Sequence, residues 1–255
     1  MTKIITVCNQ KGGVGKTTTA INISSFLAER HKRVLLIDLD GQANATTGVG
    51  IRLNENDFST YDLLKQNTIT AKQVIRRTAY NFDIIPSHIN LSGIELEINS
   101  YLGREEILKR KIENVLGNYD YIVIDTAPSL SLLSVNALSI TTDVIITVEN
   151  NPLALDGLNK LYETIGNVKA IFNPSIKISG IIITMYQSRT KVGQSVIKRL
   201  MSDERTKYIV FKTYVRRNVK LVEAIDDGKP INFYNTKCQG FTDYQNLTNE
   251  LIAKV

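Results

Sequence analysis

The chain has 255 residues, of which 43% are hydrophobic, so it can bury a full core of the size expected for one α/β domain. Its 31 Lys and Arg residues outnumber 25 Asp and Glu residues. The resulting net charge of +6 favours a polyanionic partner such as DNA, RNA or an acidic lipid surface. Cys8 and Cys238 lie far apart, without a CxxC pattern or a nearby histidine, which argues against a disulfide framework and against a zinc or iron–sulfur site.

The N-terminal residues MTKIITVCNQ contain no long apolar stretch with a cleavage site, and no later segment is long and apolar enough to cross a membrane. We therefore expect a cytoplasmic protein. No linker rich in Pro, Gly or Ser interrupts the chain, so we expect one domain over residues 1–255.

Short apolar runs rich in β-branched residues alternate with helical patterns along the whole chain. They predict buried parallel strands at residues 4–7, 34–37, 82–85, 121–124, 144–148 and 178–184. Apolar residues at helical spacing predict a helix along the sheet within residues 153–172. Residues 48–81 are more polar and predict a surface excursion with two short helical pieces, at 61–64 and 71–75. The predicted fold class is α/β, a doubly wound and mostly parallel sheet with helices on both faces.

The first predicted strand leads into a glycine-rich loop and then into a helix, which is the order of a P-loop. The loop reads Lys11-Gly12-Gly13-Val14-Gly15-Lys16-Thr17-Thr18. Glycines let backbone N–H groups point at phosphates, and the start of the helix adds a positive dipole. We expect Lys16 to reach the β- and γ-phosphates and the Thr17 hydroxyl to bind Mg²⁺. Gln10 stands where the common pattern has its first glycine, and Lys11 precedes the double glycine, so the loop has the deviant Walker A form.

Carboxylates follow two of the predicted strands. Asp38 and Asp40 end the second strand and Asp125 ends the fourth, at the edge where doubly wound sheets bind ligands. Four apolar residues precede Asp125, which is typical of a Walker B element whose carboxylate holds the Mg²⁺ shell. The alternative for such an aspartate is a helix cap.

Four blocks follow one another in order: KGGVGKTT, VLLIDLDGQANATTGVG at 34–50, YDYIVIDTAPSLSLLSVNAL at 119–138 and VRRNVKLVEAIDDGKPI at 215–231. Together they resemble the ParA/Soj family of partition ATPases over nearly the full length. The resemblance implies slow, partner-stimulated hydrolysis of ATP with Mg²⁺. It also implies an ATP-dependent homodimer that binds double-stranded DNA nonspecifically, associates with the nucleoid and acts with a ParB/Spo0J-like partner on a chromosome or a plasmid.

The same resemblance implies roles for single residues. Lys11 reaches across the dimer to the partner's phosphates, Asp40 positions the attacking water, and Asp38 supports the metal, as do Thr17 and Asp125. By the same resemblance the loops at 184–190 and 215–218 lie near the adenine, which implies cofactor contacts from Met185, Arg217 and Asn218.

Basic residues crowd the C-terminal third of the chain. Such a cluster is often only a solvated helix face. The resemblance favours DNA contacts from Arg189 and Arg217, and Lys198 is a neighbouring candidate. No aromatic platform or recognition helix is evident, so we expect phosphate contacts to dominate over base readout.

The sequence departs from the family pattern at three places. Gly41 stands where the family usually has proline, Thr126-Ala127 replaces Cys-Pro or Pro-Pro, and Arg216 replaces the proline before Arg217. The first two lie in switch-like loops and bear on loop stiffness and hydrolysis rate, and the third bears on the adenine contacts. No charged catalytic group is missing.

Two other classes share the loop. A membrane-associated positioning ATPase similar to MinD would need a basic amphipathic helix at the C-terminus, but residues 246–255 contain one Lys and one Glu and are better explained by packing on the core. A metabolic enzyme, such as a ligase similar to dethiobiotin synthetase, would turn over ATP only with its metabolite. A reductase similar to the nitrogenase iron protein would need cluster cysteines.

Overall fold

Seven strands form one sheet in a computed structural model that describes residues 1–151, 157–187 and 191–255, with only the backbone at 191–193. The strand order is β3-β4-β2-β5-β1-β6-β7, and every neighbouring pair is parallel except β3 and β4. The strands are β1 (Lys3–Cys8), β2 (Val34–Leu39), β3 (Arg76–Arg77), β4 (Asp83–Ile85), β5 (Tyr121–Thr126), β6 (Asp143–Glu149) and β7 (Lys177–Thr184). The six predicted strands and the predicted fold class are confirmed, and the antiparallel β3 is an addition.

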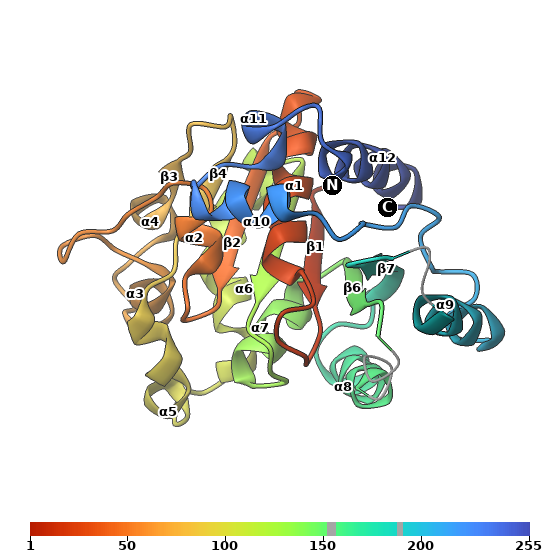
Figure 1. Cartoon of the computed structure of the whole chain (residues 1–255). Helices are drawn as coiled ribbons and strands as arrows, with labels where there is room; N and C mark the ends of the chain where they lie inside the picture. Colours follow the sequence, from red (N-terminus) through yellow and green to blue (C-terminus); the bar gives the residue numbers. More distant parts are fainter. Residues whose placement is uncertain (152–156, 188–190) are drawn as a thin grey trace.

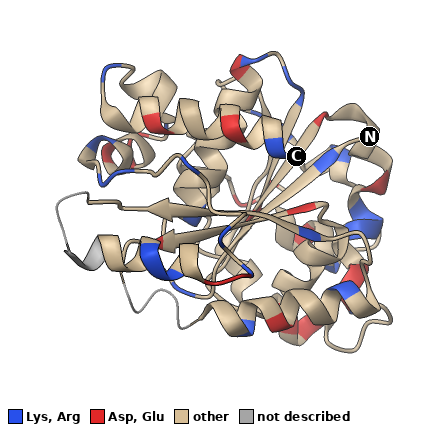
Figure 2. Cartoon of the chain, turned by 90° about the vertical axis from the view of Figure 1, so that its right-hand side faces the viewer, with Lys and Arg blue, Asp and Glu red and all other residues tan. Residues whose placement is uncertain are grey.

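Helices cover both faces of the sheet (Figures 1 and 2). Side chains alternate along each buried strand, so Ile5 and Val7 of β1 join one hydrophobic cluster and Ile4 joins another. The first cluster is closed by α1 (Lys16–Glu29), α10 (Val219–Asp226), α11 (Ile231–Tyr234) and α12 (Gln239–Lys254). The opposite face is covered by α3 (Thr60–Lys65), α4 (Ala71–Val74), α5 (Ile94–Ile98), α6 (Ile107–Ile112), α7 (Leu132–Ile140), α8 (Leu158–Ile171) and α9 (Lys191–Ser202).

The short connecting pieces are α2 (Asn44–Thr47) and the 3₁₀ turns η1 (Ile89–Gly93), η2 (Arg104–Glu106) and η3 (Glu113–Asn118). The predicted helix within residues 153–172 is α8, whose Leu158, Leu161, Ile165 and Val168 are buried as the pattern requires, but Ile171, the last apolar position of that pattern, is 71% exposed. The part of that prediction at residues 153–156 lies outside the described residues.

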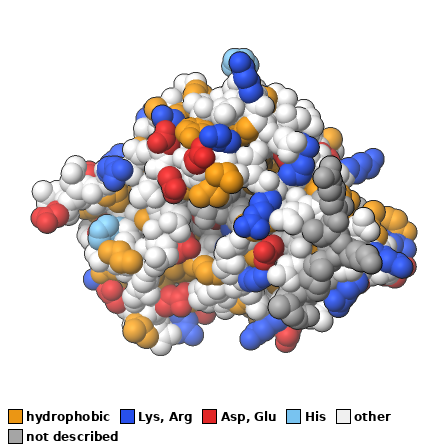
Figure 3. Space-filling view, in the orientation of Figure 1, with side chains coloured by type: hydrophobic (Ala, Val, Ile, Leu, Met, Phe, Trp, Pro, Cys, Tyr) orange, Lys and Arg blue, Asp and Glu red, His pale blue; other side chains and the backbone are white. Residues whose placement is uncertain are grey.

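Charged residues are unevenly distributed over the surface. In Figure 3, Lys and Arg are more frequent on the right of the face shown, the side of β7 and α9, and Asp and Glu are more frequent on the left. In Figure 2, α9 has blue positions and no red one, because its sequence KVGQSVIKRLMS contains no Asp or Glu. On the face shown in Figure 3, the excess of positive charge therefore lies toward the β7 end of the sheet.

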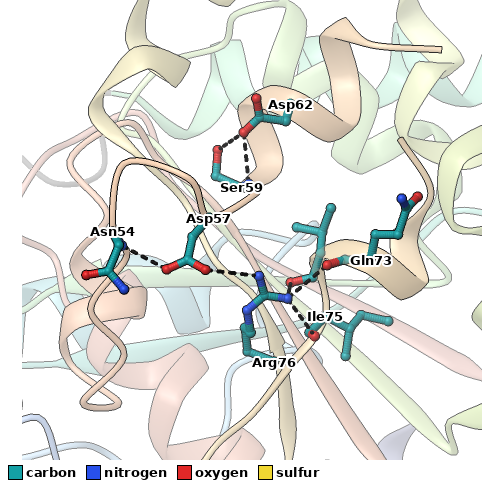
Figure 4. A network of polar contacts seen from close by, with 8 residues as sticks. Asn54, Asp57, Ser59, Asp62, Gln73, Ile75 and Arg76 are labelled. Atoms are coloured by element: carbon teal, nitrogen blue, oxygen red, sulfur yellow. Dashed lines mark hydrogen bonds and ion pairs between the residues drawn. The ribbon is translucent and has the colours of Figure 1, made fainter. Parts of the chain in front are cut away.

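Residues 48–81 are more than the surface excursion predicted from their polar composition. Leu63 and Leu64 of α3 and Val74 of α4 are buried in the same cluster as β2 and β5. Their polar neighbours stabilise the connecting loop: Asp57 accepts a hydrogen bond from the Asn54 backbone N–H at 2.8 Å and pairs with Arg76 at 3.4 Å (Figure 4). The two predicted helical pieces, at 61–64 and 71–75, are confirmed as α3 and α4, and the segment packs on the cluster of the sheet more closely than its polar composition indicated.

The C-terminal helix α12 packs on α1, as the sequence predicted for the tail. Tyr244, Leu247 and Leu251 are buried in the cluster that α1 shares, and the hydroxyl groups of Tyr244 and Thr19 lie 3.1 Å apart. Within the described ranges, no helix is long and apolar enough to span a membrane.

Candidate functional site

The loop between β1 and α1 has the backbone shape of a phosphate cradle. Gly13 and Gly15 have φ of 72° and 78°, in the left-handed region that favours glycine. Gly15 is also the residue before α1, so the helix begins at Lys16 with its first N–H groups unpaired by the helix itself. Backbone donors and the helix dipole therefore meet at one point, which suits an anion.

Hydrogen bonds from neighbouring strands hold this loop in place. The Asn9 side chain donates to the Thr147 carbonyl of β6 at 2.6 Å and accepts from the Lys11 backbone N–H at 3.0 Å. The Thr184 hydroxyl at the end of β7 donates to the Val14 carbonyl at 2.9 Å. The cradle is thus preorganised by β6 and β7, and sequence reasoning missed both supports because they are distant in the chain.

Lys16 lies at the base of the cradle with only 6% of its surface exposed. Its ammonium group donates to the Lys11 carbonyl at 3.1 Å. Burial lowers the pKa of Lys16, and the negative charges of Asp125 and Asp40 oppose that shift. A bound anion would further favour the charged ammonium.

The register of the sheet brings two of the predicted carboxylates together. Asp38 of β2 lies opposite Asp125 of β5, which in turn lies opposite Val7 of β1. Asp38 is fully buried and accepts hydrogen bonds from the Thr46 hydroxyl at 2.7 Å and the Thr46 backbone N–H at 2.8 Å. Burial raises the pKa of Asp38 to about 6, although these hydrogen bonds act in the opposite direction.

Asp125 is also fully buried, and neither of its carboxylate oxygens has a hydrogen-bond partner within the described part of the chain. The Thr17 side chain is near enough to lower the pKa of Asp125 but is outside hydrogen-bonding geometry. Burial and the neighbouring charge of Asp38 raise that pKa well above its usual range. Two carboxylate oxygens without hydrogen-bond partners, beside a threonine hydroxyl, are suitable ligands for a divalent cation.

The described residues contain no group of three or more His, Cys, Asp or Glu side chains that could hold a metal alone. This fits Mg²⁺, which takes one or two carboxylates and completes its shell with water and substrate phosphates. Of the three predicted metal groups, Asp125 offers two oxygens without a hydrogen-bond partner, whereas both oxygens of Asp38 already accept hydrogen bonds.

A cavity of about 360 Å³ opens in front of the cradle. Lys16, Thr17 and Asp40 all line it, whereas the predicted metal groups Asp38 and Asp125 are fully buried and are not among its lining residues. Asp40 is 9% exposed, and one of its carboxylate oxygens accepts from the Gln42 backbone N–H at 2.9 Å. The other lining residues are Gly12, Gly13, Gly15, Thr18, Gln42, Asn44, Pro128, Met185 and Ile225.

The residue after Asp40 shows why the chain has glycine there. A Cβ atom at Gly41 would lie 2.1 Å from the Ser92 hydroxyl and 2.8 Å from the Ser92 backbone nitrogen, in η1. The Asp40 carbonyl also accepts from the Ser87 hydroxyl at 2.7 Å. This loop therefore packs directly against the 86–93 segment, at a distance that a proline or alanine would not permit.

We expect Gly41→Ala to lower the free energy of unfolding by about 1 to 3 kcal/mol, because the new methyl group overpacks against backbone that cannot swing aside. Thermal unfolding monitored by circular dichroism measures the change. Gly117→Ala is the matched control, since a Cβ atom there meets nothing within 4 Å. Equal melting temperatures for Gly41→Ala and wild type would contradict the close packing.

A second cavity of about 190 Å³ adjoins the first and shares Gly15, Thr18 and Met185 with it. The two loops predicted to lie near the base meet here: the Tyr186 N–H donates to the Val215 carbonyl at 3.0 Å, and the Arg217 N–H donates to the Tyr186 carbonyl at 3.3 Å. Met185 adopts a left-handed φ of 52° between them. Arg217 and Asn218 line this cavity, and the Asn218 side chain also caps α10 by accepting from the Lys220 N–H.

The basic residues of the C-terminal third are not equivalent. Arg216, which replaces the family's proline, is held by Asp243 of α12 through its backbone N–H at 3.0 Å and its Nε at 3.0 Å. Lys220 pairs with Glu223 at 2.7 Å. Among the described residues, Lys198 and Arg217 form no ion pair and are exposed. Arg189 lies outside the described residues.

Lys11 was expected to point toward a partner subunit, but in the isolated chain its ammonium group pairs with the Glu149 carboxylate at 2.6 Å. Sequence reasoning missed Glu149. The available signal was its position, since it ends β6 at the same sheet edge as the aspartates.

Comparisons with known proteins agree with this geometry. The family model AAA_31, described as an AAA domain, matches residues 2–178. The chain is 43% identical over 253 residues to the sporulation initiation inhibitor protein Soj of Bacillus subtilis, with 99% of each chain covered. It is also 36% identical over 254 residues to the chromosome partitioning protein ParA of Caulobacter vibrioides, covering 99% of this chain and 94% of ParA.

Solved structures share the fold. A cobyrinic acid a,c-diamide synthase from Mycobacterium smegmatis, with a bound ATP analog and magnesium, superimposes with a TM-score of 0.87 at 30% identity, covering 99% of this chain and 95% of that one. A putative plasmid partition protein from Borrelia burgdorferi, bound to AMPPNP, gives a TM-score of 0.85 at 27% identity, with 100% of each chain covered.

Proposed function

Because this chain belongs to the Soj/ParA family of partition ATPases, we propose that it binds and slowly hydrolyses ATP with Mg²⁺ to switch between a free monomer and a DNA-bound dimer. The observation that carries the ATPase is the meeting of Lys16, Thr17 and Asp40 around one cavity at the start of α1, beside the unpaired oxygens of Asp125. The nucleotide and Mg²⁺ in the similar solved structures support the same ligands here.

In this proposal each group of the cradle has one task. The N–H groups after Gly13 and the ammonium of Lys16 hold the phosphates and neutralise charge that builds up between the β- and γ-phosphates. Thr17, Asp38 and Asp125 hold Mg²⁺, which supplies further charge neutralisation when bound. Asp40 lines the same cavity and orients the attacking water, and such positioning accounts for most of the catalysis in phosphoryl transfer.

The base and ribose would extend into the second cavity. Its lining combines apolar side chains, among them Leu221 and Val222, with the polar groups of Asn218 and Arg217. An apolar slot with a few polar groups is typical of a nucleotide-base site. Because Arg216 is held by Asp243, we assign it no contact with the nucleotide and regard it as a support for this loop.

The dimer would place two nucleotides between two copies of this face, with Lys11 of each copy reaching the phosphates bound to the other. About two fifths of the Lys11 side chain is exposed, so the residue is accessible from solvent. The basic α9 and the exposed Arg217 would then be present twice on one assembly. Lys198 of α9 and Arg217 are the described residues that we propose for the DNA phosphates, with Arg189 as the third.

We expect Arg217→Glu and Lys198→Glu to weaken binding to all DNA sequences by about tenfold or more. Each should also reduce the slope of the logarithm of the binding constant against the logarithm of salt concentration, by about one unit for every DNA phosphate that the protein no longer neutralises. Filter binding across a salt series measures both effects, with dimerisation checked by light scattering. Arg33→Glu is the control, because Arg33 is exposed and precedes β2, which is separated from β7 by three other strands. Unchanged affinity in both variants, or a loss confined to one sequence, would refute nonspecific binding by this face.

The rival classes predict different behaviour in an ATPase assay. A partition ATPase should be stimulated by DNA together with its ParB-like partner protein, whereas a metabolic ligase should respond only to its small-molecule substrate. Association with liposomes in a flotation assay would favour the membrane-positioning class. The packing of α12 on α1 supports the partition class, because it leaves the apolar side chains Leu247 and Leu251 buried.

A further inference from the structure

The ion pair between Lys11 and Glu149 joins the phosphate loop to the end of β6. Its atoms are 2.6 Å apart, and the side chains of Lys11 and Glu149 are 41% and 28% exposed. Among the described residues, no other ion pair involves the loop 9–15. The pair is accessible to solvent, so it can open without unfolding the site.

Both ends of the pair are held on rigid backbone. The Lys11 N–H donates to Asn9, whose side chain donates to Thr147, two residues before Glu149 on β6. Glu149 lies opposite Thr184 of β7, and the Thr184 hydroxyl donates to the Val14 carbonyl of the loop. Strand and loop are therefore connected at two further points, and the Lys11 and Glu149 side chains meet without needing a flexible segment.

A lysine that neutralises a phosphate on another subunit cannot keep this short contact with Glu149 at the same time. We propose that Glu149 is a positioning residue that holds Lys11 within its own subunit, and that ATP-dependent dimerisation must break this pair in both subunits. Glu149 thereby sets the ATP and protein concentrations at which the dimer forms. This inference rests on the proposed role of Lys11 in the dimer.

The expected size of the effect follows from the exposure of the pair. Partly exposed ion pairs contribute little each, equivalent to about a 1.4- to 5-fold change in an equilibrium constant. Since a symmetric dimer breaks two such pairs, removing them should tighten dimerisation by roughly 2- to 25-fold. In the wild-type dimer, Glu149 would be left unpaired, with its negative charge beside the loop that binds the phosphates. Removing that charge should tighten dimerisation further.

The test is the dimerisation constant of full-length Glu149→Gln in Mg²⁺ and AMPPNP, measured by sedimentation velocity over a concentration series. Glutamine keeps the size of the side chain and removes the charge. We expect the variant to dimerise at roughly 2- to 25-fold lower concentration than wild type, and both proteins to stay monomeric without nucleotide.

Glu97→Gln is the matched control, since Glu97 pairs with Lys65 at the same 2.6 Å and similar exposure, far from the loop in the α5 segment. It should dimerise as wild type does. A Glu149→Gln variant that melts at the wild-type temperature but dimerises no more tightly would overturn the positioning role alone. If wild type itself fails to dimerise with AMPPNP, the proposed dimer and this inference both fall.

Discussion

Lys16→Ala should weaken ATP binding by at least about 100-fold, because it removes the buried ammonium at the point where the loop and the start of α1 meet the phosphates. Asp40 and Asp125 oppose the lowering of the pKa of Lys16, so without the lysine their negative charges would also face the phosphates uncompensated. Dimerisation and DNA binding should be lost together with nucleotide binding. Titration calorimetry with ATP and Mg²⁺ measures the first effect directly.

Lys11→Ala is the informative comparison. Its side chain is accessible and paired with Glu149, away from the buried position of Lys16. We expect this variant to keep nucleotide binding by the monomer and to lose the dimer. A Lys16→Ala protein that binds ATP with nearly wild-type affinity would place the phosphates elsewhere, and a Lys11→Ala protein that still dimerises with ATP would exclude the role of Lys11 across the dimer.

Asp40→Ala should separate binding from hydrolysis. The aspartate lines the phosphate cavity and accepts from the Gln42 N–H but not from the 9–16 loop, so the cradle should remain intact while the attacking water loses its positioning group. We expect the hydrolysis rate to fall by about 10² to 10³-fold, because the attacking water is no longer positioned. ATP affinity should be retained, because the substitution removes a negative charge beside the phosphates. The variant should accumulate as an ATP-bound dimer on DNA.

Single-turnover hydrolysis and equilibrium ATP binding, measured on the same preparation, distinguish these two effects. Glu97→Gln again serves as the charge-removing control and should hydrolyse ATP at the wild-type rate. If Asp40→Ala also turns over ATP at the wild-type rate, another group orients the water.

The sheet could be predicted because its signal is local. Each buried parallel strand is covered on both faces, so it appears in the sequence as an unbroken apolar run, as at 121–124. The two-residue β3 is too short to give such a signal. The 48–81 segment was underestimated for a related reason: its buried residues, such as Leu63 and Val74, are separated by polar residues that bond within the loop.

The candidate site divides in the same way. The phosphate loop is contiguous in sequence, and the aspartates are marked by the strands that they end, so each could be located from the sequence. Contacts between distant segments could not. The Lys11–Glu149 pair spans 138 positions, and the contact of Gly41 with Ser92 depends on how a loop packs on a 3₁₀ turn. The pairing of Arg216 with Asp243 likewise removes one cation from a cluster that looked uniform in the sequence.

We expect the nucleotide state to set DNA affinity through dimerisation. Two copies of a weak basic surface on one rigid assembly should bind about 10² to 10⁴ more tightly than one copy, if both engage the same duplex. The dimer should also show a steeper salt dependence than the monomer, since it neutralises more phosphates.

The most direct test is DNA binding of the wild-type protein with Mg²⁺ and either AMPPNP or ADP, by filter binding over a salt series on a duplex of arbitrary sequence. Tight, steeply salt-dependent binding with AMPPNP and binding at least about 100-fold weaker with ADP is the predicted result. Equal affinity in the two nucleotide states, or no DNA binding in either, would contradict the account.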